Sequence, residues 1–513
     1  MMGGSLKSLP PSWFMATVGE VFDVVGGGTP STETQEYWGG TTPWITSADI
    51  EGVRQINVRK YVSDKGIAES TSNKVPAKTL LVVTRVGLGK VAISDVPLCF
   101  SQDLQGLIQS PELIVPEYAL HLLSYQLQFL KFAGQGTTIS GVTKKQLKDL
   151  AFPLPPTAEQ HRIVAKLEEL FSELDQGVAS LKTAREQIKV YRQSLLKNAF
   201  EGKLTATWRT AHSDQLETAA ALQQRIARER QARYQQQLAD WQTAGQAGPK
   251  PKPPKPLSPL TPEELAELPE LPAGWGWVYL ASVASVLSGY AFKSADFGTE
   301  GVPVIKIANV GYSQFVVKDQ EYLAAPCLKT YSSFSVRAGD FLIALTRPIT
   351  NNQTKVCRYP AGAKTALLNQ RVAALKDVEV DEEYFFAFLN TSIFKEFIRS
   401  KFSETLQPNL SPKDLERAPF PVCSVAEQLE IVQELESKLS EADQLDQTLA
   451  TALQQADALR QSILKKAFHG QLEKQDKNDE PATALLERIR AERCANQPAR
   501  RGRSAGCQSL AGF

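Results

Sequence analysis

The stretch SLLKNAFEGKL occupies residues 194–204, and SILKKAFHGQL occupies residues 462–472, 268 positions further along the chain. Each reads as the last turns of a helix, because lysine side chains favour the C-terminal end of the helix dipole. The glycine near the end of each stretch supplies the left-handed conformation that commonly stops a helix. The same helix ending, used twice at such a distance, predicts an internal repeat.

The repeat extends upstream of the two helix endings. AEQHRIVAKLEELFSELDQ (158–176) aligns with AEQLEIVQELESKLSEADQ (426–444), and over 158–204 and 426–472 the two copies are identical at 24 of 47 positions without a gap. Weaker matches pair LPPSW (9–13) with LPAGW (271–275), PWITSADI (43–50) with PVIKIANV (303–310), LLVVTR (80–85) with FLIALTR (341–347), and AALQQRIARER (220–230) with TALLERIRAER (483–493). The chain therefore consists of two copies of one plan, each a variable domain followed by a similar helical segment.

The apolar residues of the repeated segments recur mostly at steps of three and four, which is the pattern of a coiled-coil seam. They are Ile163, Leu167, Leu170, Leu174, Val178, Leu181, Ile188, Tyr191, Leu195 and Ala199 in the first copy, and Ile431, Leu435, Leu439, Leu445, Leu449, Leu453, Leu459 and Ile463 in the second. Each copy predicts a helix of about 42 residues, roughly 63 Å long. The partner of matching length is the other copy, and the chain direction favours an antiparallel pair with a pseudo-twofold axis. The alternative is that each helix pairs with a different protein.

The two variable domains mix short β-rich runs with helical patterns, which predicts an α+β fold for each. VVGGGTPSTETQEYWGGTTPWITSADI (24–50) is rich in Gly, Thr and Ser, and such loops can present backbone N–H groups and hydroxyls to phosphates and bases. Ordinary turns are the alternative interpretation. Residues 1–157 carry 13 Lys and Arg against 13 Asp and Glu, and residues 270–425 carry 16 against 15. Any electrostatic attraction to DNA phosphates must therefore come from a local cluster of basic side chains or from partner proteins.

Several function classes lack their sequence signals. The VGLGK at 86–90 is too short for a phosphate-binding loop, and no Asp/Asn-Pro-Pro-aromatic methyltransferase loop occurs. The six cysteines and four histidines have no metal-ligand spacing, so we expect free thiols in a reducing cytosol and no metal. We also expect no signal peptide and no membrane span. The chain is expected to be a cytoplasmic protein that is not an enzyme by itself.

These residues resemble the specificity subunit of type I restriction–modification systems over about residues 9–495. The resemblance rests on LLKNAFEGKL and ILKKAFHGQL, on the AEQ openings at 158–160 and 426–428, and on GGTPSTETQEYWGGTTPWITSAD near the start. It implies two target recognition domains that each read half of a bipartite, asymmetric DNA site, with helix length setting the gap between the halves. Domain two begins with SGYAFKSADF (288–297) instead of GGTPST, which is a variant start for this family.

The resemblance also implies partners and cofactors. Double-stranded DNA, two methyltransferase subunits and two restriction and translocation subunits would assemble on this chain, in a bacterial or archaeal cytoplasm. S-adenosylmethionine, ATP and magnesium would bind those partners and not this chain. Two alternatives stay open: a coiled-coil scaffold without catalysis, and a specificity partner of a methyltransferase that works without a nuclease.

The resemblance divides the chain into six segments: 1–157 and 270–425 as recognition domains, 158–204 and 426–472 as coiled-coil helices, 205–269 as a helical insert with a Pro/Lys-rich linker, and 473–513 as a short helix and disordered tail. Base readout needs forked donors, amides or short polar side chains. The predicted DNA-binding residues are Thr46, Ser47, Asp49, Arg85, Gln102, Lys144 and Lys145 in domain one, and Lys306, Asn309, Arg347, Asn369, Gln370 and Gln407 in domain two. Arg85 and Arg347 are expected at equivalent places after a strand. The predicted helix-end and partner-docking residues are Lys197, Phe200, Gly202, Lys465, Phe468 and Gly470.

Overall fold

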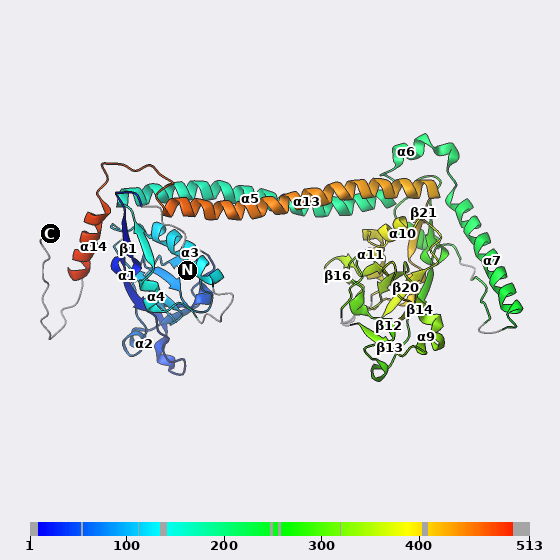
Figure 1. Cartoon of the computed structure of the whole chain (residues 1–513), viewed down its shortest axis with the longest axis horizontal. Helices are drawn as coiled ribbons and strands as arrows, with labels where there is room; N and C mark the ends of the chain where they lie inside the picture. The colour runs from blue at the N-terminus through cyan, green and yellow to red at the C-terminus, as the bar shows by residue number, and fades with distance from the viewer. Residues whose placement is uncertain are drawn as a thin grey trace. The chain divides into compact units, whose positions relative to one another are not determined.

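The computed structural model describes residues 9–52, 55–110, 112–133, 141–246, 250–254, 258–318, 320–402 and 409–495 (Figure 1). The chain separates into two compact units, Met1–Lys182 with Ala450–Phe513, and Thr183–Leu449. Each unit contains one globular α+β domain together with part of each of two long helices. The α+β class predicted from the sequence is confirmed.

In unit 1 the globular domain is built on three small sheets. Strand β1 (Phe14–Thr17) pairs with β9 (Ala151–Leu154), so the two ends of the domain lie together. The central sheet has the order β2 (Asp23–Gly26), β8 (Leu104–Ile108), β5 (Leu80–Val83) and β6 (Val91–Ile93). The third sheet has the order β4 (Lys60–Val62), β3 (Trp38–Ile45) and β7 (Cys99–Phe100), with β3 and β7 parallel. Helix α3 (Pro116–Ala133) covers the central sheet through Tyr118, Leu122 and Leu123.

Unit 2 repeats this plan, with one more strand in its third sheet and an added hairpin of β16 (Ile349–Thr350) and β17 (Gln353–Thr354). Strand β10 (Gly276–Tyr279) pairs with β21 (Pro419–Val422). The central sheet has the order β11 (Ser285–Ser288), β20 (Val372–Lys376), β15 (Phe341–Ala344) and β18 (Val356–Arg358). A four-stranded sheet of β13 (Glu321–Leu323), β12 (Val302–Ile305), β19 (Ala366–Leu368) and β14 (Ser335–Val336) contains the parallel pair β12 and β19. Helices α10 (Glu382–Phe388) and α11 (Ser392–Ser400) bury Tyr384, Phe388 and Phe394 in the same core.

The repeated segments form the two long helices α5 (Thr157–Phe200) and α13 (Val425–Phe468), which run side by side in opposite directions (Figure 1). In unit 2, Arg192 pairs with Asp443 at 2.6 Å and Arg185 with Asp446 at 2.8 Å. In unit 1, Arg460 pairs with Asp175. Arg460 and Asp175 are the repeat equivalents of Arg192 and Asp443, so one ion pair occurs twice with the helices exchanging roles. The predicted antiparallel pairing of the helices and the internal repeat are confirmed.

The seam between the long helices is narrower than the sequence pattern predicted. Tyr191, Leu445 and Leu459 are about half exposed, at 47%, 51% and 51%, and therefore lie on the outside of the helix pair. Ala442, which was not assigned to the seam, is buried at 4% exposure. The reason is geometric: a two-helix pair has room for two positions per heptad, while a broad apolar stripe supplies more.

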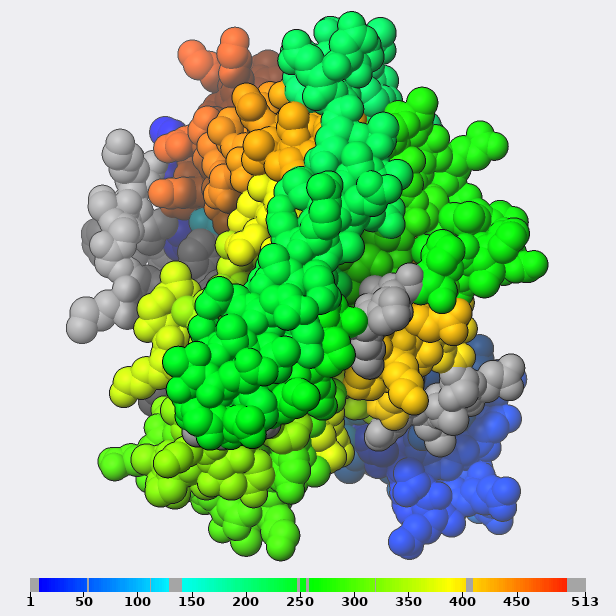
Figure 2. All heavy atoms as spheres, turned by 90° about the vertical axis from the view of Figure 1, so that its right-hand side faces the viewer, coloured from blue at the N-terminus to red at the C-terminus, as the bar shows by residue number. Residues whose placement is uncertain are grey.

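The insert after α5 contains α6 (Ala206–Ala211), α7 (Ala219–Thr243) and α8 (Pro262–Ala266). Figure 2 shows α7 lying across the surface of unit 2, where Leu222 and Ile226 enter the core. Its counterpart α14 (Ala482–Ala495) enters the core of unit 1 through Leu485 and Ile489. Arg230 of α7 bonds Glu379 and the Ala281 carbonyl, and Arg493 of α14 bonds Asp23 and the Glu20 carbonyl. The insert therefore contains α7, which is one of two equivalent helices that each pack on a globular domain.

Three further expectations from the sequence concern the cysteines, membrane-spanning segments and domain boundaries. Within the described residues, all five cysteines are free thiols, as predicted; Cys507 and the rest of the 498–513 tail lie outside them. No helix in the described ranges is both long and apolar enough to cross a membrane. The predicted domain boundaries stay a prediction.

Candidate functional site

The ends of the long helices are anchored in the globular cores. Phe200, at the end of α5, is fully buried in unit 2 and packs on Tyr384 and Phe388 with ring centroids 4.8 and 5.4 Å apart. Phe468, at the end of α13, packs in unit 1 on Tyr118 and Tyr125 at 5.7 and 5.6 Å. The start of each helix is held in the same way, because Gln160 accepts from the Val115 N–H and Gln428 from the Asp381 N–H. Each domain therefore holds the start of one long helix and the end of the other.

Gly202 and Gly470 are the helix stops that the sequence predicted. Their φ angles are +69° and +65°, and the following N–H groups of Lys203 and Gln471 reach back to the carbonyls of Asn198 and Lys466. This is the hydrogen-bond pattern of a Schellman cap. A side chain at Gly202 would also collide with Pro272, since an added Cβ would lie 2.4 Å from its Cγ.

The six residues predicted for the helix ends and for partner docking therefore have different roles. The rings of Phe200 and Phe468 are enclosed by the chain's own cores, so their burial assigns them to anchoring and not to a partner. Gly202 and Gly470 cap their helices. Lys197 and Lys465 are exposed on the last helical turns, and partner docking at these two residues stays a prediction.

The predicted DNA-binding residues of domain one gather at one edge of the central sheet. This polar edge consists of the turn 46–49 after β3, the loop 84–90 after β5, the turn 101–103 before β8, and residues 142–145. Backbone bonds hold it together: Ser101 N–H to Ile45, Thr84 N–H to Asp103, and Val142 N–H to Thr84, at 2.9, 2.9 and 2.7 Å. Lys90 adds a bond from its Nζ to the Ile50 carbonyl at 2.7 Å. Residues far apart in the sequence thus form one surface.

Domain two has the same polar edge, made of 306–309, 345–355, 369–371 and 409–411. The Asn369 N–H donates to Ile305, the Leu345 N–H to Arg371, and the Leu410 N–H to Leu345, at 3.0, 2.9 and 2.8 Å. These three bonds correspond one for one to those of domain one. Gln407 lies outside the described residues, so its predicted role has no structural description.

Asp49 and Asn309 occupy the same structural position and serve the fold. The Asp49 carboxylate accepts from the Thr46 N–H at 2.7 Å and pairs with Arg59 at 2.7 Å. Asn309 accepts from the Lys306 N–H at 2.8 Å and donates to the Val316 carbonyl at 3.0 Å. Both residues are buried, with Asp49 5% and Asn309 2% exposed. Their hydrogen-bonding groups are already used within the turns, which argues against the predicted base contact.

Three neighbours of these residues are also buried or held by contacts. Ser47 is buried, at 8% exposure. Lys306 pairs with Glu321, and its Nζ lies 4.0 Å from the centre of the Phe297 ring. Thr46 is half-buried, and its hydroxyl donates to Asp49 at 2.8 Å. These contacts stiffen the turns that support the polar edge.

The exposed members of the polar edge are the ones free to meet a ligand. Gln102, Lys144 and Lys145 are exposed, although Gln102 also accepts a bond from the Thr29 hydroxyl at 2.6 Å. In domain two Gln370 is exposed and Asn369 is half-buried. Arg85 is exposed in domain one, so with Lys90, Lys144 and Lys145 it makes this edge locally basic despite the balanced charge of the domain.

Arg347 is exposed and has a φ of +48°, in the left-handed region that non-glycine residues rarely adopt. Such backbone strain concentrates at ligand-contacting sites and costs about 1–3 kcal/mol. The predicted equivalence with Arg85 is off by one residue. Leu345 makes the bond that Thr84 makes, so Arg85 corresponds to Thr346, and Arg347 follows one position later.

Sequence reasoning missed two residues of the polar edge. Lys90 ends the loop after β5 and holds the Ser47–Ile50 turn in place. Arg371 is exposed directly after the predicted pair Asn369 and Gln370. Aligning SQDL (101–104) with NQRV (369–372) provides the signal for Arg371, because both stretches lead into the same central strand.

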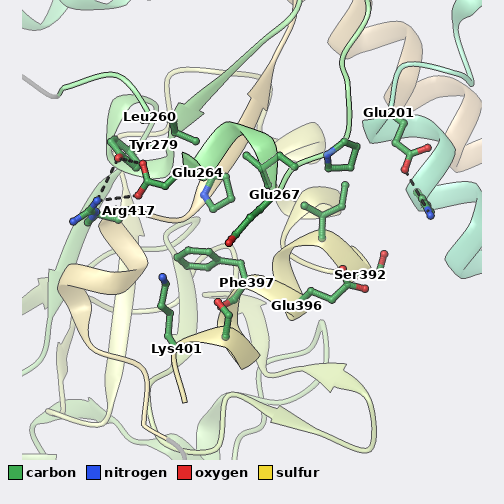
Figure 3. A pocket seen from close by; sticks show the side chains of 16 residues that line it. Glu201, Leu260, Glu264, Glu267, Tyr279, Ser392, Glu396, Phe397, Lys401 and Arg417 are labelled. Carbon is green, nitrogen blue, oxygen red and sulfur yellow. Dashed lines mark hydrogen bonds and ion pairs between the residues drawn. The ribbon is translucent and has the colours of Figure 1, made fainter. Parts of the chain in front are cut away.

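A separate crevice of about 480 Å³ in unit 2 lies where the insert returns to the domain (Figure 3). Glu264 of α8 accepts from the Tyr279 hydroxyl at 2.6 Å and from Arg417 at 2.9 Å, as the dashed lines in Figure 3 mark. Glu201 on the opposite wall pairs with Lys203. The contacts of Glu264 fasten the linker to the domain. Across the described ranges no group of three or more His, Cys, Asp and Glu side chains is placed to hold a metal ion.

Comparison with known proteins points in one direction. The family model of the type I restriction modification DNA specificity domain matches residues 10–182. The specificity subunit of the type I restriction enzyme EcoDI from Escherichia coli is 24% identical over 505 residues, which cover 96% of this chain and 98% of that subunit. The MjaIX specificity subunit of Methanocaldococcus jannaschii is 29% identical over 200 residues, covering 38% of this chain and 45% of that protein.

Solved structures share the fold. A chain from a study of complex assembly and conformational transition of the type I R-M system aligns over 91% of this chain and 100% of its own length, with a TM-score of 0.60 and 18% identity. The HsdS subunit from Thermoanaerobacter tengcongensis aligns over 92% of this chain and 100% of its own, with a TM-score of 0.51 and 18% identity.

Proposed function

We propose that this chain, a member of the specificity subunits of type I restriction–modification systems, recognises a bipartite, asymmetric DNA site through the polar edges of its two domains. One half-site is read by each domain, and the long helices join the two. The chain is a non-catalytic subunit that provides recognition and a platform for assembly.

The observation that carries this proposal is the repeated polar edge. The same three backbone bonds build it in both domains, which supports a shared mode of presentation to DNA. Gln102 and Gln370 occupy the same position, but the other exposed or half-buried side chains on the two frames differ: Arg85, Lys144 and Lys145 in one, Arg347 and Asn369 in the other. Equal frames with unequal side chains suit two different half-sites, since base edges are distinguished by donor and acceptor patterns.

Features of the helix pair support the docking of methyltransferase subunits. Lys197 and Lys465 are exposed at matched helix ends, and Tyr191, Leu445 and Leu459 expose apolar surface on the helices. Two of these pairs occupy equivalent positions of the repeat, Lys197 with Lys465 and Tyr191 with Leu459. This match favours two methyltransferases, with two restriction and translocation subunits added to them. These partners would bind S-adenosylmethionine, ATP and magnesium. Because the substrate is the cell's own and invading DNA, the complex would work in the cytoplasm of a bacterium or archaeon.

Methylation-sensitive long-read sequencing tests this function. DNA from cells that carry the locus is compared with DNA from cells in which only this chain is deleted. The expected result is a bipartite adenine-methylation motif, present on both strands, that disappears with the chain. An unchanged methylome, with the methyltransferase expressed, would favour the coiled-coil scaffold. Methylation without restriction of unmodified phage would favour a partner of a methyltransferase that lacks a nuclease.

Replacing Arg347 with alanine is expected to reduce specific DNA binding by about 1–3 kcal/mol and to relax one half-site. The reason is its exposure on a strained turn of the domain-two polar edge. Competition binding of the assembled complex to single-base variants of the site measures the effect. Arg337→Ala is the matched control, because Arg337 is also an exposed arginine that follows a strand of domain two. Its strand, β14, pairs with the start of β19, whereas the polar edge follows the end of β19. Equal weakening on every sequence, with a shallower salt dependence, would reassign Arg347 to a phosphate.

A further inference from the structure

Asp103 and Arg371 occupy one structural position and carry opposite charges. We propose that this position sets which base each domain reads, with Arg371 directed to a guanine and Asp103 to the amino group of a cytosine or adenine. The inference rests on the proposed DNA-recognition function and names the residues that distinguish the two half-sites.

The equivalence of the two residues follows from backbone geometry. The Asp103 carbonyl accepts from the Thr84 N–H at 2.9 Å, and the Arg371 carbonyl accepts from the Leu345 N–H at 2.9 Å. The next residue along the chain begins the same central strand in each domain, where Leu104 lies opposite Val83 and Val372 opposite Ala344. Both residues therefore stand last before the strand, at the centre of the polar edge.

The backbone at this position is fixed while the side chain is not. The Leu104 N–H closes a turn on Ser101 at 3.2 Å, and the Val372 N–H closes the matching turn on Asn369 at 3.0 Å. Arg371 is exposed and Asp103 is half-buried. Across the described part of the chain, no hydrogen bond or ion pair is recorded for either charged group. A rigid frame with an unengaged charged group is what readout of a base edge requires.

The charge reversal decides between bases and phosphates. If this position faced the DNA backbone in both domains, Asp103 would place a carboxylate against phosphate, which like-charge repulsion disfavours. Base edges can be bound by side chains of either charge. Arginine donates two hydrogen bonds to O6 and N7 of guanine, while aspartate accepts a hydrogen bond from N4 of cytosine. Adenine N6 is an amino donor of the same kind.

The test uses the complete chain assembled with its methyltransferase and a library in which each base pair of the wild-type site is changed singly. Arg371→Ala should lower the preference at one G·C pair of a single half-site by about 5- to 150-fold, the range expected for one bidentate contact. Arg371→Lys should lose most of that preference, because an ammonium lacks the planar fork. Asp103→Asn should change the preferred base in the other half-site only. Arg228→Ala, at an exposed arginine on α7, is the control.

Three outcomes would overturn the inference. Arg371→Ala could weaken binding equally on all sequences and lower the salt slope by about 1, which marks a phosphate contact. It could leave the base preference at the wild-type level, which marks a bystander. A change in both half-sites would mark a defect of the fold. These outcomes differ from failure of the proposed function, in which the wild-type complex itself would select no bipartite site.

Discussion

Phe200→Ala is expected to release the end of α5 from unit 2 and to cost about 3–5 kcal/mol of local stability. The Phe200 side chain is fully buried against Tyr384 and Phe388, and its helix ends directly afterwards at Gly202. Truncation removes a large apolar side chain from the core and leaves a cavity that the neighbouring aromatic rings fill only partly. Because the ring joins a long helix to the globular domain of unit 2, the loss should also weaken the attachment of that helix to the domain.

Amide hydrogen exchange of the full chain measures this effect with an internal control. Exchange should accelerate in residues 195–204 and in α10, while residues 463–472 keep their protection. Phe468→Ala should give the reverse pattern, because Phe468 packs in unit 1 on Tyr118 and Tyr125. Unchanged protection in both variants would show that the rings are dispensable, and equal loss at both helix ends would show general unfolding.

The long helices could be predicted from the sequence because their signals are local and repeated. The spacing of the apolar residues and the two glycines predicted where α5 and α13 run and where they end. Because the segment occurs twice with matched length, each helix could be predicted to pair with the other. The same local reasoning overestimated the seam, since Tyr191 and Leu445 carry the right spacing but lie outside it. Spacing identifies an apolar face, while the partner's width decides how much of that face is covered.

The polar edge was harder to predict because tertiary pairing creates it. Asp49 and Asn309 have the polar side chains that read bases, but each is consumed by a turn whose closure depends on groups several residues away. Arg371 was missed although it adjoins two predicted residues. Its importance appears only when the Leu345 and Thr84 bonds reveal that it and Asp103 share a position.

Glu427→Ala is expected to be the most damaging single change at the start of α13, costing about 3–5 kcal/mol. Glu427 is 1% exposed and accepts from Thr205 Oγ1 at 2.8 Å, Arg209 Nη1 at 2.7 Å and Trp275 Nε1 at 2.8 Å. Arg209 in turn donates to the Gly202 carbonyl at 2.7 Å, so one carboxylate ties the start of α13 to the cap of α5. Removing it leaves a largely buried guanidinium without its counter-charge.

The repeat supplies the matched control for this change, because Glu159 holds the same place at the start of α5. Gln475 donates to Glu159 at 2.7 Å, but the nearby Arg162 is already paired with Asp479 at 2.6 Å. Burial raises the pKa of Glu159, against the opposing effects of Trp13, Gln475 and Arg162. Glu159→Ala should therefore cost clearly less than Glu427→Ala in hydrogen exchange at the corresponding helix start. Equal losses would mean that burial of the carboxyl, and not its pairing with an arginine, determines the cost, and a larger loss at Glu159 would reverse the argument.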